Sequence, residues 1–456
     1  MMNALSAAAE LHGARAAPPP AAPEFADILP RQAKTVLDTG LPPRLVTELV
    51  VKVLHGSGKT PLPALSARLK LSVNVLREIL NQLMAEQQVE VAWTGDSDID
   101  VQYQLTAPGQ RAAADYLAQS RYAGPAPVPL ASYREVVERQ SLRRPGAPRP
   151  ERAQLAAALA EHGFDPALRD VLGAALHSRR ALLLYGPSGA GKTLLAHQLA
   201  RLQHGAVALP YALLVERQII QFYDPLLHQP APPLPRQQEE RRSWDARWAI
   251  CQRPLVHVGA ALAADMLDLR EDAASGVLRA PPHVLANNGM LVVDDLGRQR
   301  LPLADLLGRW LGALDQGWDA LALPGGHSET VPFDATVVFA TSLAPDALLD
   351  ESFLRRIGYK VGLGPLPEAA YRALLRRACR QAGIEPDEDA ASRLLALHAA
   401  SGRPLLPAYP HELLGRISDF ASFAGATPRL SAAAVEQAWN SMFAACAAPT
   451  TSGEPS

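Results

Sequence analysis

The sequence predicts an α/β protein in which a doubly wound parallel sheet is preceded by a small α+β domain and followed by helices. Three observations lead to this prediction. Apolar runs typical of buried strands occur at 181–185, 290–293 and within 335–342, and the second and third lead into polar residues. The first run leads into a glycine-rich stretch, GPSGAGKT, at 186–193. Residues 31–120 carry helical apolar patterns and then two alternating, strand-like stretches.

Composition excludes several classes of protein. The 456 residues suffice for two or three domains, and 44 basic against 46 acidic side chains give no excess charge for a dedicated nucleic-acid or membrane binder. No apolar run approaches the roughly 20 residues that span a bilayer, and the N-terminus lacks an apolar signal segment. Cys251, Cys379 and Cys446 are widely separated, which argues against disulfides or a zinc site. We therefore expect a soluble, cytoplasmic protein.

Stretches rich in proline and alanine mark the expected domain boundaries, because they carry too little apolar surface to build a core. The expected segments are a disordered tail at 1–30, a compact domain at 31–122, a Pro-rich linker at 123–150, the α/β core at 151–362, a helical domain at 363–445 and a disordered tail at 446–456.

The first compact domain is expected to hold three helices and a β-hairpin. Helices are predicted at 43–55, 61–71 and 72–86, where apolar residues recur at helical spacing. The stretches QVEVAWT (88–94) and DVQYQLT (100–106) flank a polar turn and predict the hairpin, and a further helix follows near 108–117. This pattern resembles a winged-helix domain.

The tripeptide GKT occurs twice, at 58–60 and at 191–193. A phosphate-binding loop needs a strand, a glycine, four residues, then Gly-Lys-Ser/Thr at the start of a helix. In HGSGKT (55–60) the required glycine position is Val53, a helix precedes the motif, and Pro61 follows it. We therefore interpret this copy as a loop between helices, with Gly56 as the helix cap.

The second copy meets every requirement and predicts a nucleotide-binding loop. Lys192 is expected on the β- and γ-phosphates, and the hydroxyl of Thr193 is expected to bind Mg²⁺. The loop residues are Gly186, Pro187, Ser188, Gly189, Ala190, Gly191, Lys192 and Thr193.

Two later strands end in polar residues suited to the same site. Asp294 and Asp295 follow the run at 290–293; Asp294 is expected beside Mg²⁺, and Asp295 is expected to orient the attacking water. The strand within 335–342 ends in Thr341 and Ser342, either of which could hold that water. The segment FLRRI adds Arg355 and Arg356.

The order of these motifs resembles the AAA+ ATPases over residues 150–445. The resemblance implies ATP and Mg²⁺ as ligands, a C-terminal helical lid, and a homo-oligomeric ring in which Arg355 or Arg356 acts on a neighbour's ATP. A finer resemblance is to the group with a β-hairpin before sensor 1, which includes MoxR-type chaperones. Residues 318–332 would form that hairpin, with its turn at Pro324-Gly325-Gly326. Residues 225–280 would be an insertion that either reaches the ring pore or forms a surface loop.

Three positions depart from the AAA+ pattern. Asp295 stands where the family has Glu, and Ser342 or Thr341 stands where it commonly has Asn. His411 replaces the sensor-2 arginine, and Arg416, the nearest basic residue, lies on a different face of the helix. A misplacement of about 1 Å can cost roughly a hundredfold in rate, so we expect slow or partner-stimulated turnover.

The charge of the first domain bears on its partner. Residues 31–120 hold nine basic and nine acidic side chains, and the predicted wing, TGDSDID, holds three acids. This balance favours docking of a protein over DNA. We therefore expect ATP hydrolysis coupled to remodelling or assembly of a protein client, with no membrane partner. The alternative is a nucleotide-switched, DNA-associated or transcriptional regulator.

Overall fold

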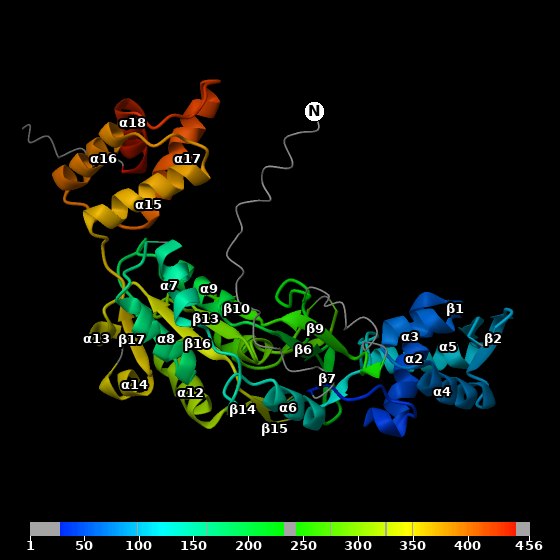
Figure 1. The fold of residues 1–456 in the computed structure, drawn as a ribbon. Coiled ribbons are helices and arrows are strands. Elements are labelled where there is room, and N and C mark those ends of the chain that lie inside the picture. Colours follow the sequence, from blue (N-terminus) through cyan, green and yellow to red (C-terminus); the bar gives the residue numbers. More distant parts are fainter. Residues whose placement is uncertain are drawn as a thin grey trace, which may run out of the picture. The chain divides into compact units, whose positions relative to one another are not determined.

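The computed structural model describes residues 28–443, apart from 98, 162, 232–242, 274, 324–325 and 349 (Figure 1). Both predicted tails lie wholly or almost wholly outside this range. The chain divides into two compact units. Unit 1 comprises residues up to Pro148, Gly205–Arg253 and Arg270–Ala280, and unit 2 comprises Arg149–His204, Pro254–Leu269 and the residues from Pro281 onward. No helix in the described ranges is long and apolar enough to cross a membrane.

Unit 2 contains the predicted parallel sheet. Its five strands follow the order β10-β13-β16-β5-β17, and every neighbouring pair is parallel. The strands are β5 (Leu182–Tyr185), β10 (Leu255–Val258), β13 (Met290–Val293), β16 (Thr336–Thr341) and β17 (Tyr359–Gly362). Strand β10 corrects the sequence analysis, which counted its residues within an insertion.

The sheet is covered on both faces, as a doubly wound fold requires. Along β13, Met290 and Val292 face one core while Leu291 and Val293 face the other, because successive side chains point to opposite faces. One core is completed by α7 (Arg152–Glu161), α8 (Leu168–Ser178) and α9 (Lys192–Arg201). The other is completed mainly by α12 (Leu303–Gln316), with α14 (Glu351–Arg356) packed against it.

The predicted hairpin at 318–332 is confirmed. Strands β14 (Trp318–Ala322) and β15 (Ser328–Pro332) pair antiparallel, although Pro324 and Gly325 of its turn lie outside the described residues. A buried polar network holds its base: Asp319 contacts His283 on α11 (Pro282–Leu285) and Arg309 on α12. Arg309 also forms a bidentate ion pair with Asp268, which follows η3 (Ala264–Leu267). The short helix α13 (Pro345–Leu348) follows β16.

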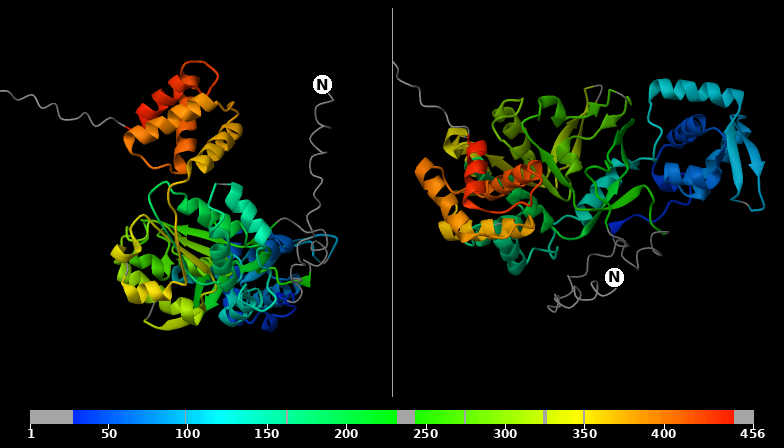
Figure 2. Two further views of the ribbon diagram at one scale, coloured as in Figure 1. Left: turned by 60° about the vertical axis from the view of Figure 1, so that its left-hand side comes forward. Right: turned by 90° about the horizontal axis from the view of Figure 1, so that it is seen from above.

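Four C-terminal helices pack on one another around a core of their own (Figure 2). They are α15 (Glu368–Gln381), α16 (Glu388–Ser401), α17 (Ala408–Phe423) and α18 (Ala432–Met442). Buried His398 contacts the rings of Tyr371, Tyr409 and Trp439 at their centre.

The first part of unit 1 contains the predicted helices and hairpin. After η1 (Leu37–Thr39), the elements are α2 (Pro43–Ser57), β1 (Thr60–Pro61), α3 (Leu62–Leu69), α4 (Val73–Ala85), β2 (Val89–Thr94), β3 (Val101–Leu105) and α5 (Ala107–Gln119). Strand β1 was not predicted; it pairs with β3 in the order β1-β3-β2. HGSGKT follows no strand, as expected. Its helix cap is Gly58, at φ +68°, rather than Gly56, which lies within α2.

The rest of unit 1 combines the predicted linker with much of the predicted insertion. Residues 123–150 contribute β4 (Val128–Pro129) and α6 (Leu130–Arg139). Strand β4 joins a five-stranded sheet, and β6 and β9 form a separate pair. The remaining strands are β6 (Ala206–Pro210), β7 (Ala212–Val215), β8 (Gln218–Gln221), β9 (Trp248–Gln252), β11 (Arg270–Glu271) and β12 (Leu278–Arg279). The described part of 225–280 is therefore an ordered structure and not a surface loop.

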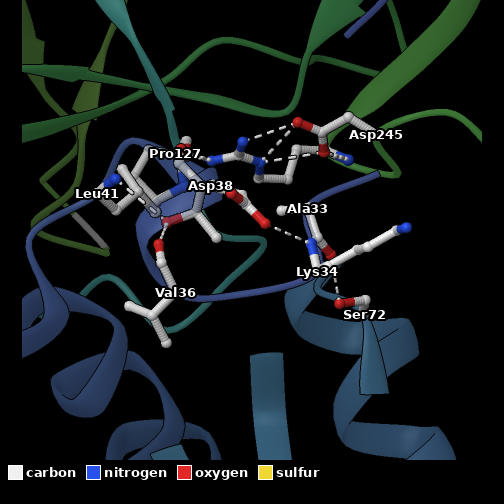
Figure 3. A network of polar contacts seen from close by, with 10 residues as sticks. Ala33, Lys34, Val36, Asp38, Leu41, Ser72, Pro127 and Asp245 are labelled. Atoms are coloured by element: carbon white, nitrogen blue, oxygen red, sulfur yellow. Dashed lines mark hydrogen bonds and ion pairs between the residues drawn. The ribbon is translucent and has the colours of Figure 1, made fainter. Parts of the chain in front are cut away.

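The buried side chain of Arg247 connects three segments of unit 1 through an ion pair and hydrogen bonds (Figure 3). Arg247 and Asp245 are both almost fully buried, with an Nη2–Oδ2 distance of 2.7 Å. The guanidinium group also donates to the backbone oxygens of Thr39 and Pro127, each at 2.9 Å. One side chain thus links the N-terminal domain, the predicted linker and the insertion.

Candidate nucleotide-binding site

The glycine-rich loop leaves β5 and ends at α9, as the motif predicts. Gly186 adopts φ +140°, and a Cβ atom added there would lie 2.0 Å from the backbone oxygen of Leu363. Only glycine fits this position, because the clash would be with backbone that cannot move aside. Gly191, also at positive φ, caps the N-terminus of α9, whose free backbone N–H groups favour a bound phosphate.

Lys192 is buried beneath this loop. Its Nζ donates to the backbone oxygens of Gly186 at 2.8 Å and Pro187 at 3.0 Å. Burial lowers the pKa of Lys192, and the nearby carboxylates of Asp294 and Asp295 partly oppose that effect. The ammonium group therefore lies inside the loop, where the charges of both acids act on it.

Thr193 and Asp294 come together from different elements. Thr193 begins α9, whereas Asp294 follows the carboxyl end of β13, and the Thr193 hydroxyl donates to Asp294 Oδ2 at 2.5 Å. The carboxyl ends of parallel strands share one edge of a sheet, which is the usual ligand edge of such folds. The pairing therefore places a hydroxyl and a carboxylate together next to the phosphate loop.

The Asp294 carboxylate is strongly held in its charged form. Burial alone would raise the pKa of Asp294. Hydrogen bonds from His257, Thr193 and the backbone N–H of Asp295 outweigh burial and lower this pKa to about 2. His257, on β10, has its Nε2 3.4 Å from Asp294 Oδ2 and its ring 5.4 Å from that of His197 on α9. The sequence analysis missed His257, because only the strand order brings it to this edge.

Asp295 is exposed and has a left-handed backbone, at φ +51°. Its backbone N–H donates to Asp294 Oδ1 at 2.9 Å, so both oxygens of Asp294 have partners. The side chain of Gln299 contacts the same turn, a feature that no sequence motif indicated.

Thr341 and Ser342 occupy different environments at the end of β16. Thr341 is buried, its hydroxyl donates to the backbone oxygen of Leu296 at 2.9 Å, and it accepts from the N–H of Leu343. The Thr341 hydroxyl proton therefore supports the turn after β13. Ser342 is partly exposed.

Arg355 and Arg356 both lie exposed at the end of α14. Arg355 forms an ion pair with Glu351, one turn earlier, at 2.6 Å. Within the described residues no such partner is seen for Arg356. An exposed pair of this kind contributes little, about 0–1 kcal/mol, so it restrains Arg355 only weakly.

The positions predicted for sensor 2 lie on α17. His411 is exposed and Arg416 is partly exposed, and neither contacts the Thr193–Asp294 pair directly in the described structure. The first residue of the helix does meet the phosphate loop, because the Ala408 N–H donates to the backbone oxygen of Gly189 at 3.2 Å.

The residues at this edge fit a hard divalent cation. Thr193 and Asp294 offer a hydroxyl and a charged carboxylate 2.5 Å apart, and Mg²⁺ is bound in proteins by one or two such oxygens together with substrate phosphates. The described residues contain no cluster of three His, Cys, Asp or Glu side chains that could hold a metal alone. The chemistry of these donors therefore suits a metal that arrives with a phosphate ligand.

Comparisons with known proteins add little to this picture. A family described as "Domain of unknown function (DUF8689)" matches residues 367–441, which coincide with the four C-terminal helices. No curated protein matches the chain. The RuvB Holliday junction branch migration motor of Thermotoga maritima is similar at 16% identity and a TM-score of 0.35, over 68% of this chain and 71% of that one. A mutant of the same protein gives 17% and 0.36, over 60% and 67%.

Proposed function

We propose that the chain is an AAA+ P-loop ATPase that binds ATP with Mg²⁺ and hydrolyses it slowly or when stimulated by a partner. One observation carries the proposal. Thr193 and Asp294 meet at 2.5 Å at the ligand edge of a parallel sheet, directly beside a glycine loop that encloses Lys192. These are the groups that a P-loop NTPase needs around its phosphates.

Each residue then has a role set by its position. Lys192 exchanges its contacts with loop carbonyls for the β- and γ-phosphates, and the N–H groups at the start of α9 bind phosphate oxygens. Thr193 and Asp294 would hold Mg²⁺, and the ion would supply positive charge for the phosphate oxygens. Asp295 and Ser342 orient the attacking water. Arg356 supplies positive charge to the ATP of a neighbouring subunit.

Slow turnover follows from the same residues. Asp295 is one methylene shorter than the glutamate of related motifs, and His411 stands at the predicted sensor-2 position in place of an arginine. Both changes weaken stabilisation of the transition state while leaving the binding groups intact. We therefore expect firm binding of ATP and weak basal hydrolysis.

A pair of lysine variants tests nucleotide binding. Lys192→Ala should weaken binding of ATP with Mg²⁺ by at least about a hundredfold, because it removes a buried charge aimed at the phosphates. Lys59→Ala changes the lysine of the other GKT and should bind as the wild type does. Titration calorimetry measures both. Equal affinities for the two variants would contradict the proposal.

The hairpin β2–β3 supports a protein partner. Val91, Trp93 and Ile99 are each about half exposed on it, at 45%, 49% and 51%. Strand β2 is also an edge strand. Residues 88–106 hold four acidic and no basic side chains. Exposed apolar groups among acids suit a basic protein surface and repel DNA phosphates. We therefore propose that ATP turnover acts on a bound protein client.

A further inference from the structure

The turn after β13 carries both acids of the proposed ATPase site. It runs from Asp294 to Gly297, and two of its residues have left-handed backbones: Asp295 at φ +51° and Gly297 at φ +93°. A non-glycine residue in this conformation persists only when its surroundings hold it there. The contacts that hold this turn therefore decide where Asp295 points.

Gln299 makes three of those contacts. Its side-chain nitrogen donates to the backbone oxygens of Asp294 at 2.8 Å and Asp295 at 3.1 Å. Its side-chain oxygen accepts from the N–H of Gly297 at 2.8 Å. One side chain thus forms hydrogen bonds with three backbone groups of the turn from Asp294 to Gly297.

The opposite side of the turn is held by the neighbouring strand. The N–H of Leu296 donates to the backbone oxygen of Ala340 at 2.8 Å, and the Thr341 hydroxyl donates to the backbone oxygen of Leu296. These bonds fix only the middle of the turn. The backbone oxygens of both acids depend on Gln299 and on the N–H of Arg298, which donates to Asp295.

We propose that Gln299 is a positioning residue that sets the direction of the Asp295 carboxylate for ATP hydrolysis. The inference rests on the proposed ATPase function. Gln299 does not touch the nucleotide loop in the described contacts, so it acts through the turn. Replacing Gln299 should therefore slow ATP hydrolysis, in which Asp295 orients the water, and should leave the phosphate-binding groups in place.

Three variants test the inference in the full-length protein. Gln299→Met removes all three hydrogen bonds at similar length and adds no charge. Gln299→Glu keeps the acceptor but loses the amide donor. Gln316→Met, at the exposed end of α12, is the matched control. We expect both Gln299 variants to lower kcat for ATP by about tenfold or more and to leave the Kd for ATP with Mg²⁺ within about threefold.

Two further measurements separate positioning from general damage. Hydrogen exchange of the amides of residues 295–297 should be faster in Gln299→Met and unchanged in Gln316→Met. If Gln299 acts through Asp295, adding Gln299→Met to Asp295→Asn should lower kcat little further, so the two effects should not add.

The inference is overturned by wild-type kcat and exchange in Gln299→Met, or by kcat effects that add fully to those of Asp295→Asn. A wild-type protein that binds no ATP instead contradicts the proposed function. The two failures are therefore distinct.

Discussion

Asp295 shows how backbone conformation selects a side chain. The turn after β13 requires φ +51° at this position. Short polar residues such as Asp tolerate left-handed backbone better than longer side chains, because they can hydrogen-bond locally. The backbone conformation thus gives a physical reason for aspartate, in place of glutamate, at this position. The shorter side chain also limits how far its carboxylate extends into the site.

The buried His283 makes the stability of the fold depend on pH. Burial lowers the pKa of His283 below its ordinary 6.5, although Asp319 partly opposes this. The unfolded chain therefore gains a proton near pH 6.5, whereas the folded chain gains it only at lower pH. The contribution of His283 to the free energy of unfolding is therefore largest above about pH 6.5 and decreases as the pH falls. Burial also raises the pKa of Asp319, but contacts with His283 and Arg309 outweigh it, so protonation of Asp319 adds a loss at still lower pH.

We expect the thermal midpoint of the wild type to fall between about pH 7 and pH 5, and to fall less in His283→Gln, whose amide cannot gain the proton. His327→Gln changes an exposed histidine on the hairpin loop and should keep the wild-type slope. Calorimetry across this pH range measures both. A slope in His283→Gln equal to that of the wild type would rule out this account.

At the scale of elements, some features follow from sequence and others do not. GPSGAGKT and the strands at β5, β13 and β16 are local patterns, so the sequence alone suffices to bring the glycine loop, Thr193 and Asp294 to one site. Strand β10 lies within the stretch at 225–280 that the sequence analysis interpreted as an insertion, so its residues were not assigned to the sheet. His257 and Gln299 reach Asp294 through strand order and a tight turn, and neither leaves a periodic signal.

The joining of elements in unit 1 depends on Arg247. Replacing one partner of a buried ion pair leaves the other charge without compensation, which costs about 3–5 kcal/mol. Arg247→Leu also leaves the backbone oxygens of Thr39 and Pro127 without this donor. We expect it to lower the free energy of unfolding by that amount in a denaturant titration.

Two controls sharpen this experiment. Arg217→Leu, at an exposed position of the same unit, should change stability by no more than about 0.5 kcal/mol. The double variant Asp245→Leu with Arg247→Leu should recover part of the loss, because it removes both buried charges. If Arg247→Leu and Arg217→Leu have the same free energy of unfolding, the Arg247–Asp245 ion pair does not stabilise the unit.

At the scale of the whole molecule, the proposed ring can be tested by complementation. Lys192→Ala lacks a phosphate-binding lysine and Arg356→Ala lacks the proposed finger, so each variant alone should hydrolyse almost no ATP. In a mixed ring, an intact Lys192 of one subunit meets an intact Arg356 of the next. Equal mixing should restore about a quarter of wild-type turnover if each site needs both groups.

Arg355→Ala serves as the control for this mixture, because the proposal assigns the trans-acting charge to Arg356 and expects turnover without Arg355 to be normal. Phosphate release measured against the mixing ratio gives the result. Mixtures that stay inactive at every ratio, or an Arg356→Ala protein with normal turnover, would exclude action between subunits through Arg356.

The division into two units has a consequence for how the chain connects them. The chain passes between them five times, after Pro148, His204, Arg253, Leu269 and Ala280. Two of these passages adjoin elements that contribute to the proposed ATP site at their other ends: one follows α9, which begins with Lys192, and another precedes β10, which carries His257. Unit 1 is therefore joined to unit 2 by several covalent connections and not by a single terminal linker.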